Sequence, residues 1–165
     1  MNLLPLSFDA VLAVARDMRA ADRREIFATR WDDDQESLAL ECVNACCIGA
    51  VIAGRDNAPI AAIGAVELWP TVWSVWMFAT DRWPEVALDA TRFVKQRLIP
   101  ALLDLGLRRA ECRSSIAHGQ AHRWLEYLGA RREAEHRDYG KNGETFIGFH
   151  WRAEDVRKSL QATED

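Results

Sequence analysis

The sequence contains 9 glycines, but none lies between Gly64 and Gly106. The gap matters because an apolar segment predicted as a strand over 72–79 runs directly into an amphipathic helix that begins near Pro84. A turn of this kind can bind a phosphate through its backbone N–H groups, and glycine lets the backbone come close to the ligand. The turn reads Thr80-Asp81-Arg82-Trp83-Pro84-Glu85 instead. The missing glycines therefore argue against a phosphate site at this turn.

The chain also lacks the long apolar and basic segments that mark several protein classes. No apolar run reaches the roughly 18 residues of a membrane span, and residues 1–6 are too short and lack the basic start of a signal peptide. The net charge of −4 and the pI of about 5.6, without any run of basic residues, argue against a general nucleic-acid binder. We therefore expect no membrane span, no secretion through a signal peptide and no nucleic-acid partner.

The residues that usually bind metals or act as nucleophiles are scattered. The four cysteines show no paired metal spacing, and reduced thiols are the expectation, with Cys42 and Cys46 one helical turn apart as small buried hydrophobic residues. His118 and His122 are four residues apart, but Gly119 interrupts the pair near the predicted start of a helix. No Gly-x-Ser-x-Gly motif is present. The sequence predicts no metal site.

The 165 residues are expected to form a single domain over 1–165, with 152–165 as a polar tail or short helix. Apolar spacing predicts a strand at 3–6, a helix over 8–19 that Ser7 caps, a second short helix that Asp22 caps, and a helix over 37–45. Alternation of apolar residues predicts strands at 47–53, 60–68 and 72–79. A long helix follows from Pro84 to Gly106 with a kink at Pro100. The remaining predicted elements are a strand at 107–116, a helix at 119–128 and a hairpin of 131–139 with 145–151.

This order resembles the Gcn5-related N-acetyltransferase (GNAT) superfamily over nearly the whole chain. The resemblance implies an α/β fold with a mixed, mostly antiparallel sheet flanked by helices. It also implies that the strand at 72–79 is antiparallel to 60–68, runs parallel to 107–116, and diverges from the latter. Two short stretches look like the small GNAT-like internal virion proteins of short-tailed bacteriophages, with further similarity at Glu135, Gly140, Gly143 and Phe146. These stretches are Phe78-Ala79-Thr80-Asp81 and His122-Arg123-Trp124-Leu125-Glu126-Tyr127-Leu128-Gly129-Ala130.

The chain departs from the pattern of the superfamily's enzymes at the turn after residue 79. Those enzymes carry Arg/Gln-x-x-Gly-x-Gly/Ala there, and the glycine positions fall on Trp83 and Glu85 in this sequence. Trp83 would crowd the backbone, and Glu85 would repel phosphate at the helix N-terminus. The resemblance therefore predicts a degenerate acetyl-coenzyme A site and no cofactor. If a cofactor does bind, the residues implied are Met77, Phe78, Ala79, Thr80 and Arg82.

The candidate catalytic residues are few. Superfamily enzymes often place a tyrosine as general acid four residues before the glycine that closes the late helix, and Leu125 occupies that position here. Tyr127 lies on another face of this helix but is the available hydroxyl. The candidates for a general base are Glu67, late in the predicted strand 60–68, and Glu111, within the predicted strand 107–116. Both have a simpler interpretation as solvent-facing strand residues.

Seven tryptophans suggest a contact surface, because tryptophan is enriched at interfaces. Trp69, Trp73 and Trp83 flank predicted turns and are the candidate interaction residues. The resemblance to the virion proteins and the degenerate acetyl-coenzyme A site imply a bacteriophage virion-associated or assembly protein, located in the virion or host cytoplasm. Its expected partners are other virion proteins or copies of itself. The alternative is an acetyl-coenzyme A-dependent N-acetyltransferase acting on an amine. A third interpretation, an immunity or antirepressor-like binding module, has no specific support in the sequence.

Overall fold

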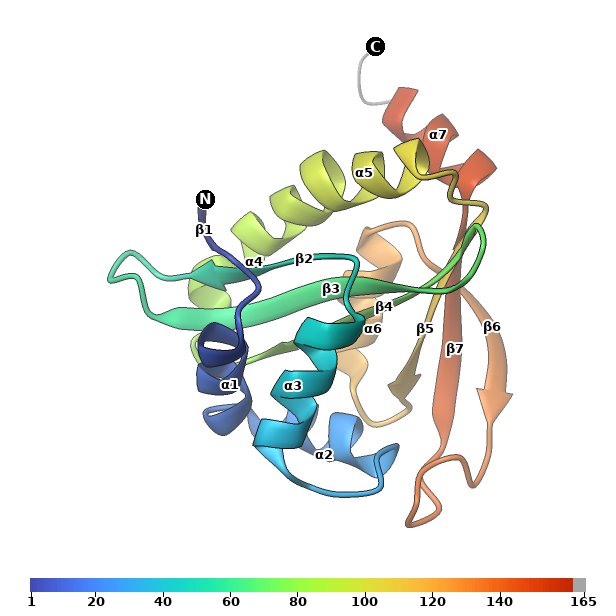
Figure 1. Cartoon of the computed structure of the whole chain (residues 1–165). Helices are drawn as coiled ribbons and strands as arrows, with labels where there is room; N and C mark the ends of the chain where they lie inside the picture. The colour runs from blue at the N-terminus through green and yellow to red at the C-terminus, as the bar shows by residue number, and fades with distance from the viewer. Residues whose placement is uncertain (162–165) are drawn as a thin grey trace.

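A seven-stranded sheet with strand order β1-β2-β3-β4-β5-β7-β6 forms the centre of the molecule (Figure 1). The computed structural model describes residues 1–161. Every neighbouring pair of strands is antiparallel except β4 and β5, which run parallel. The fold class predicted from the sequence is therefore confirmed. The strands are β1 (Asn2–Leu4), β2 (Ile48–Ala53), β3 (Pro59–Trp69), β4 (Val72–Ala79), β5 (Arg109–Ser115), β6 (Arg131–His136) and β7 (Phe146–Arg152).

Helices cover both faces of the sheet because its strands alternate between two apolar clusters. The aligned residues Val51, Ala62 and Phe78 pack against the helices α1–α3 on one face. Trp73 and Ala79 belong to the cluster beneath α4–α6 on the other face. The helical elements are α1 (Phe8–Arg16), α2 (Ala20–Ala28), α3 (Gln35–Ala45), α4 (Trp83–Phe93), the π-helix η1 (Val94–Leu98), α5 (Ile99–Asp104), α6 (Gly119–Tyr127) and α7 (Ala153–Gln161).

The two parallel strands β4 and β5 pair over only three residues and then diverge, as the resemblance implied (Figure 1). Their ladder consists of Val72 with Arg109, Trp73 with Ala110 and Ser74 with Glu111. We call this short paired segment the vertex, and the separated ends near Ala79 and Ser115 the mouth. The divergence leaves space between two adjacent strands of one sheet, and the functional site is built around this space.

Two predicted helices differ from the observed ones. The helix predicted over 8–19 ends at Arg16, because Met18 forms a β-bridge with Thr80 and pulls the chain onto the end of β4. Helix α2 then begins at Ala20 without a side-chain cap, and Asp22 does not act as the predicted cap. Its carboxylate accepts a hydrogen bond from the Ala79 N–H at 2.8 Å instead. Tertiary contacts with β4 thus override the local capping pattern.

The long helix after β4 contains a π-helical turn, η1, directly before Pro100. Proline lacks an N–H and its ring collides with the carbonyl four residues earlier in an α-helix. In η1 the Ile99 N–H donates to the Val94 carbonyl, five residues back, which widens the helix at this point. A kink was predicted at Pro100, and the structure has a π-helical turn just before this residue.

Two of the three candidate interaction tryptophans are inside the protein. Trp73 is 2% exposed and Trp83 is 5% exposed, and both belong to the apolar cluster beneath α4–α6. The ring of Trp83 packs edge-on against Trp124, with 5.4 Å between ring centroids. Trp73 and Trp83 therefore cannot contact a partner in this fold, which corrects that expectation. Trp69, at 60% exposed, is the one of the three that lies on the surface.

Truncation of the buried tryptophans should destabilise the protein. We expect Trp73→Ala and Trp83→Ala each to lower the free energy of unfolding by about 3–5 kcal/mol, because each removes a large ring from the core. Trp69→Ala is the matched control and should change the free energy of unfolding by less than about 0.5 kcal/mol. Urea denaturation followed by circular dichroism measures all three. Similar losses for all three variants would contradict this assignment.

Candidate functional site

A cleft of about 360 Å³ lies along the diverging strands β4 and β5. Its lining includes Val75 and Met77 from β4, and Cys112 and Ser114 from β5. Helix α2 contributes from one face of the sheet, while η1, α5 and α6 contribute from the other. The cleft therefore reaches both faces of the sheet through the opening between the two strands.

The edge of β4 that faces the cleft has no ladder partner beyond the vertex in the part of the chain that the structure describes. On its other edge, β4 is fully paired with β3 as far as Ala79. An unpaired strand edge offers backbone N–H and C=O groups to a ligand in the cleft. This edge can therefore bind an extended amide-containing ligand in the manner of an added strand.

Helix α2 closes the mouth of the cleft with buried polar side chains. On the β4 side, the Arg19 N–H donates to the Ala79 carbonyl at 2.9 Å, and the Ala79 N–H donates to Asp22. On the β5 side, the Glu25 carboxylate accepts from the Ser114 hydroxyl at 2.8 Å and from the Ser115 N–H at 2.6 Å. One helix thus supplies partners for the ends of both strands.

His118 lies between the two carboxylates of α2. Its Nε2 is 3.3 Å from Asp22 Oδ1, and its Nδ1 is 3.3 Å from Glu25 Oε2. The guanidinium of Arg19 donates to Asp22 Oδ1 at 2.7 Å. Burial raises the pKa of Asp22, and the Arg19 charge and the Ala79 N–H offset part of this effect. We call these residues the α2 cluster: Arg19, Asp22, Glu25, Ser114 and His118.

The turn after β4 is occupied by ion pairs. Arg82 donates to Asp56 at 2.9 Å from one nitrogen, and to Glu85 at 2.8 and 2.7 Å from two others. The Trp83 N–H donates to the Thr80 carbonyl and the Glu85 N–H to the Arg82 carbonyl, so two N–H groups of the helix start are already used. The turn therefore presents a guanidinium whose charge is balanced by neighbouring carboxylates.

A second set of charged residues lies at the vertex. Glu111 is the partner of Ser74 in the last paired position, and its carboxylate lines the cleft. The Arg109 Nε donates to Glu111 at 2.8 Å, and Arg109 also forms an ion pair with Glu133. Arg113, also in the lining, lies 3.8 Å from Glu111. Glu111 is therefore a fixed carboxylate at the point where the two strands part.

The other two catalytic candidates lie outside the cleft. Glu67 accepts a hydrogen bond from the Thr71 N–H at 3.1 Å and so braces the turn between β3 and β4. Tyr127 is 67% exposed, and the Lys95 ammonium lies 4.4 Å from its ring centroid. Of the three candidates, the cleft contains only Glu111. Sequence reasoning did not identify the α2 cluster, in which the contacting residues Glu25 and His118 are 93 positions apart.

The proposed cofactor residues are divided between the cleft and the core. Met77 lines the cleft, whereas Phe78 is buried in the cluster beneath α1–α3. The backbone of Ala79 is bonded to α2 at the mouth. Thr80 is buried, and its hydroxyl accepts from the Arg82 N–H at 3.2 Å. Met77 is therefore the residue of this set whose side chain reaches the open part of the cleft.

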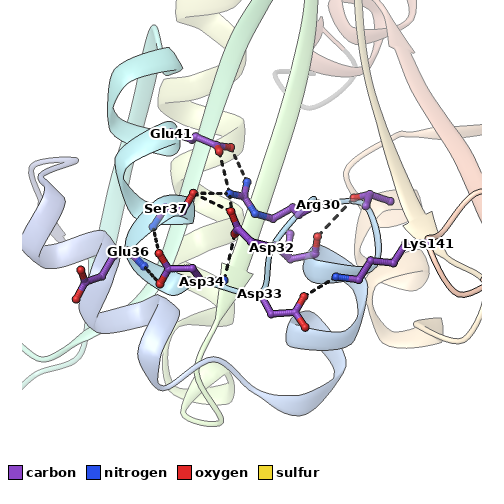
Figure 2. Close-up of polar contacts among 10 residues, drawn as sticks. Arg30, Asp32, Asp33, Asp34, Glu36, Ser37, Glu41 and Lys141 are labelled. Carbon is purple, nitrogen blue, oxygen red and sulfur yellow. Dashed lines mark hydrogen bonds and ion pairs between the residues drawn. The ribbon is translucent and has the colours of Figure 1, made fainter.

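The wall beside α2 is held by ion pairs in the loop between α2 and α3 (Figure 2). Arg30 makes two hydrogen bonds to Glu41, at 2.6 and 2.9 Å. Lys141, in the turn between β6 and β7, contacts Asp33 at 2.6 Å through its ammonium, and its N–H donates to the Ala28 carbonyl at 2.8 Å. These contacts fix the end of α2 to the β6–β7 turn, and so keep the α2 cluster in place.

Cleft chemistry that depends on a metal or a reactive thiol finds little support in the described residues. No group of three or more His, Cys, Asp or Glu side chains among them could hold a metal ion. Burial raises the pKa of the Cys112 thiol to about 12, so this cleft residue carries almost no thiolate at neutral pH.

None of the described helices is long and apolar enough to cross a membrane.

The chain is similar to several solved structures, and two of the three described below are N-acetyltransferases. It matches Ard1 from Thermoplasma volcanium at a TM-score of 0.71 and 10% identity, covering 92% of this chain and 96% of that one. The ribosomal-protein-S18-alanine N-acetyltransferase from Escherichia coli matches at 0.66 and 13% identity (93% and 92% covered). A GCN5-related N-acetyltransferase from Brucella melitensis matches at 0.67 and 16% identity (97% and 80% covered). No protein-family model and no curated protein sequence matches the chain.

These similarities establish that the chain has the GNAT fold. They also correct the main functional prediction from the sequence. A virion-associated protein was expected, but the chain resembles several solved structures of acetyltransferases, and no similarity described here links it to bacteriophage proteins. The alternative prediction, an N-acetyltransferase, is the better supported one.

The α2 cluster should be important for stability. Arg19→Ala leaves the buried Asp22 without its cation, so we expect a loss of about 3–5 kcal/mol in the free energy of unfolding. Arg16→Ala is the control, because Arg16 forms an exposed ion pair with Glu36 that should contribute at most about 1 kcal/mol. Urea denaturation at neutral pH compares the two. Equal, small losses would show that the cluster does not hold α2 on β4.

The thiols should differ in reactivity. Burial raises the pKa of both Cys42 and Cys112 to about 12, and since only the thiolate reacts, these two should be inert to iodoacetamide at pH 8 in the folded protein. Cys47 is exposed and should be alkylated first. Peptide mass spectrometry after timed alkylation identifies the order, with urea-unfolded protein as the control in which all four react. Rapid alkylation of Cys112 in the folded protein would contradict its burial.

Proposed function

We propose that this protein is an N-acyltransferase that moves an acetyl group from acetyl-coenzyme A to an amine. The observation that carries the proposal is a cleft between diverging parallel strands with a fixed carboxylate, Glu111, at its vertex. The similarity to solved N-acetyltransferases agrees with this proposal.

The cleft fits the pantetheine arm of the donor. That arm is narrow and contains two amides, and the unpaired edge of β4 offers N–H and C=O groups along the cleft. Val75 and Met77 line the same stretch with apolar atoms. The arm would therefore lie between the two strands, with its thioester at the vertex beside Glu111.

The turn after β4 fits the diphosphate of coenzyme A less well. Arg82 is its cation, and the carboxylates of Asp56 and Glu85 already neutralise that charge. A diphosphate at this turn would have to replace those carboxylates as the partner of Arg82 while Asp81 adds repulsion. The affinity for coenzyme A thioesters should therefore come mainly from the arm and the acyl group.

Acetyl-coenzyme A, when bound, supplies the acetyl group as an activated thioester. The protein's own contribution is to hold the amine and remove its proton. Glu111 carries the negative charge that attracts an ammonium group, and it can accept a proton from the amine as the new bond forms. Arg109 fixes the carboxylate by a 2.8 Å hydrogen bond, so Glu111 is positioned before the substrate arrives. The amine nitrogen attacks the thioester carbonyl, the C–S bond breaks, and coenzyme A leaves as a thiolate that takes a proton from solvent. No nucleophile on the protein is needed, since proximity and a base are sufficient for this transfer.

Glu111→Gln should lower kcat for acetyl transfer by about a hundredfold or more, because the amide cannot accept the proton. Purified protein is incubated with acetyl-coenzyme A and a panel of polyamines, amino acids and peptide α-amines, and acetylated products are detected by mass spectrometry. Glu67→Gln is the matched control and should leave kcat unchanged, since Glu67 only braces a turn. Full activity in Glu111→Gln would exclude Glu111 as the base. No acetylated product from any amine with the natural sequence would count against the function itself.

A further inference from the structure

One end of the cleft is apolar and lies beyond the vertex, away from the charged residues. Leu107 precedes β5 at the vertex, and Trp151 of β7 is the ladder partner of Ala110, which itself pairs with Trp73. Leu98, Leu102, Leu128 and Val156 are further apolar residues of the cleft lining. We call these six residues the deep pocket: Leu98, Leu102, Leu107, Leu128, Trp151 and Val156.

The deep pocket differs from the charged part of the cleft in the polarity of its lining. The charged lining residues come from α2, the start of α6 and the Glu111–Arg113 segment of β5. The described side chains of the deep pocket carry no charge, and the single polar group among them, the Trp151 N–H, already donates to the Leu128 carbonyl at 3.0 Å. A ligand group in the deep pocket therefore meets no side-chain polar group of these six residues that lacks a partner, and an amine or phosphate there would lose its hydration without compensation.

The π-helical turn η1 forms part of this wall. Leu98 belongs to η1, and the i→i+5 bond from Ile99 to Val94 widens the helix where it borders the pocket. Turns of this type occur frequently at functional sites. Protein interiors rarely keep voids larger than a water molecule, so an apolar hollow beside a reaction centre indicates a ligand group that fills it.

We infer that the deep pocket binds the acyl chain of the donor, and that the preferred donors carry medium-length acyl groups, such as hexanoyl, in place of acetyl. The inference rests on the proposed function, because that function puts the thioester at the vertex. On one side of the vertex the lining is polar and includes Glu111 and Arg113, which suits the amine acceptor. On the other side the lining is the apolar deep pocket. The acyl chain is the apolar group attached at that point, so it is the group that the deep pocket receives.

Binding of coenzyme A thioesters that differ only in the acyl group tests this inference. Isothermal titration calorimetry with acetyl-, butanoyl-, hexanoyl- and octanoyl-coenzyme A should give a Kd for hexanoyl-coenzyme A at least about tenfold lower than that for acetyl-coenzyme A, because each buried methylene adds favourable transfer free energy. The same order is expected in kcat/KM for acylation of whichever amine is accepted. Equal affinities, or tighter binding of acetyl-coenzyme A, would overturn the inference.

A filled pocket provides the second arm of the test. Leu102→Phe should reduce the ratio of hexanoyl to acetyl affinity by about tenfold, because the larger ring occupies the space of the chain. Leu105→Phe is the matched control on the exposed side of the same helical segment, and its ratio should match that of the natural sequence. If Leu102→Phe does not fold, as judged by circular dichroism, Leu98→Phe replaces it. An unchanged ratio in a folded variant would overturn the inference.

The outcomes separate this inference from the proposed function. Acetyl transfer without any preference for longer donors would overturn the acyl-chain pocket and leave the acetyltransferase standing. A preference for hexanoyl-coenzyme A that Leu102→Phe removes would support both. If no thioester binds and no amine is acylated, the function and the inference both fail.

Discussion

The early separation of β4 and β5 is the constraint on which the rest of the structure depends. Two strands that part leave backbone N–H and C=O groups without ladder partners, and buried groups of this kind must find other partners. At the mouth, α2 provides them: Arg19 and Asp22 bond to Ala79, and Glu25 bonds to Ser115. Between the mouth and the vertex the edge of β4 has no ladder partner among residues 1–161, and this stretch borders the cleft. The same divergence thus explains the position of α2 and the existence of the site.

The way in which α2 is held has an electrostatic consequence. Buried ion pairs cost desolvation energy, so they contribute more to positioning than to net stability when each partner is satisfied. Asp22 and Glu25 are three positions apart and therefore lie on one face of α2, each directed at a different strand. A helix held by apolar contacts alone could slide along the sheet, whereas these carboxylates fix it to particular backbone groups of β4 and β5. The mouth of the cleft therefore has a defined shape.

Much of the fold could be predicted from the sequence because its signals are local. Alternating apolar residues mark β2, β3 and β4, and the turns between them follow from Gly54 to Pro59 and from Pro70. The divergence of the strands came only from the resemblance, since no local pattern specifies where a parallel pair separates. The α2 cluster was missed for a related reason. Glu25 and Ser115 are 90 positions apart, and an isolated Asp, Glu or His in a sequence gives no sign of such a contact.

The tryptophans show how local reasoning fails at the ends of elements. Trp69, Trp73 and Trp83 all flank turns, yet only the first is exposed, because strand alternation directs Trp73 into the core and the first turn of α4 directs Trp83 there. The candidate catalytic glutamates divide in the same way: Glu67 braces a turn, whereas the register of β5 with β4 brings Glu111 to the vertex. In each comparison the residues are of the same type and have similar sequence surroundings. Their different positions follow from how the strands and helices pack, which the local sequence does not specify.

The directions of the side chains in the turn after β4 change the explanation of why it is a poor phosphate site. Trp83, at a position where glycine was expected, was predicted to crowd an approaching phosphate, but its ring packs inward against Trp124. The obstacle to a diphosphate is instead the charge balance around Arg82, whose guanidinium is shared by Asp56 and Glu85. A steric block would exclude a phosphate altogether, whereas ion pairs on the surface can exchange partners at modest cost because water screens them. Under the proposed function, these residues would therefore weaken binding of the nucleotide end of a donor without closing the cleft. Recognition of the donor would then depend on the strands, the vertex and the apolar pocket beyond it.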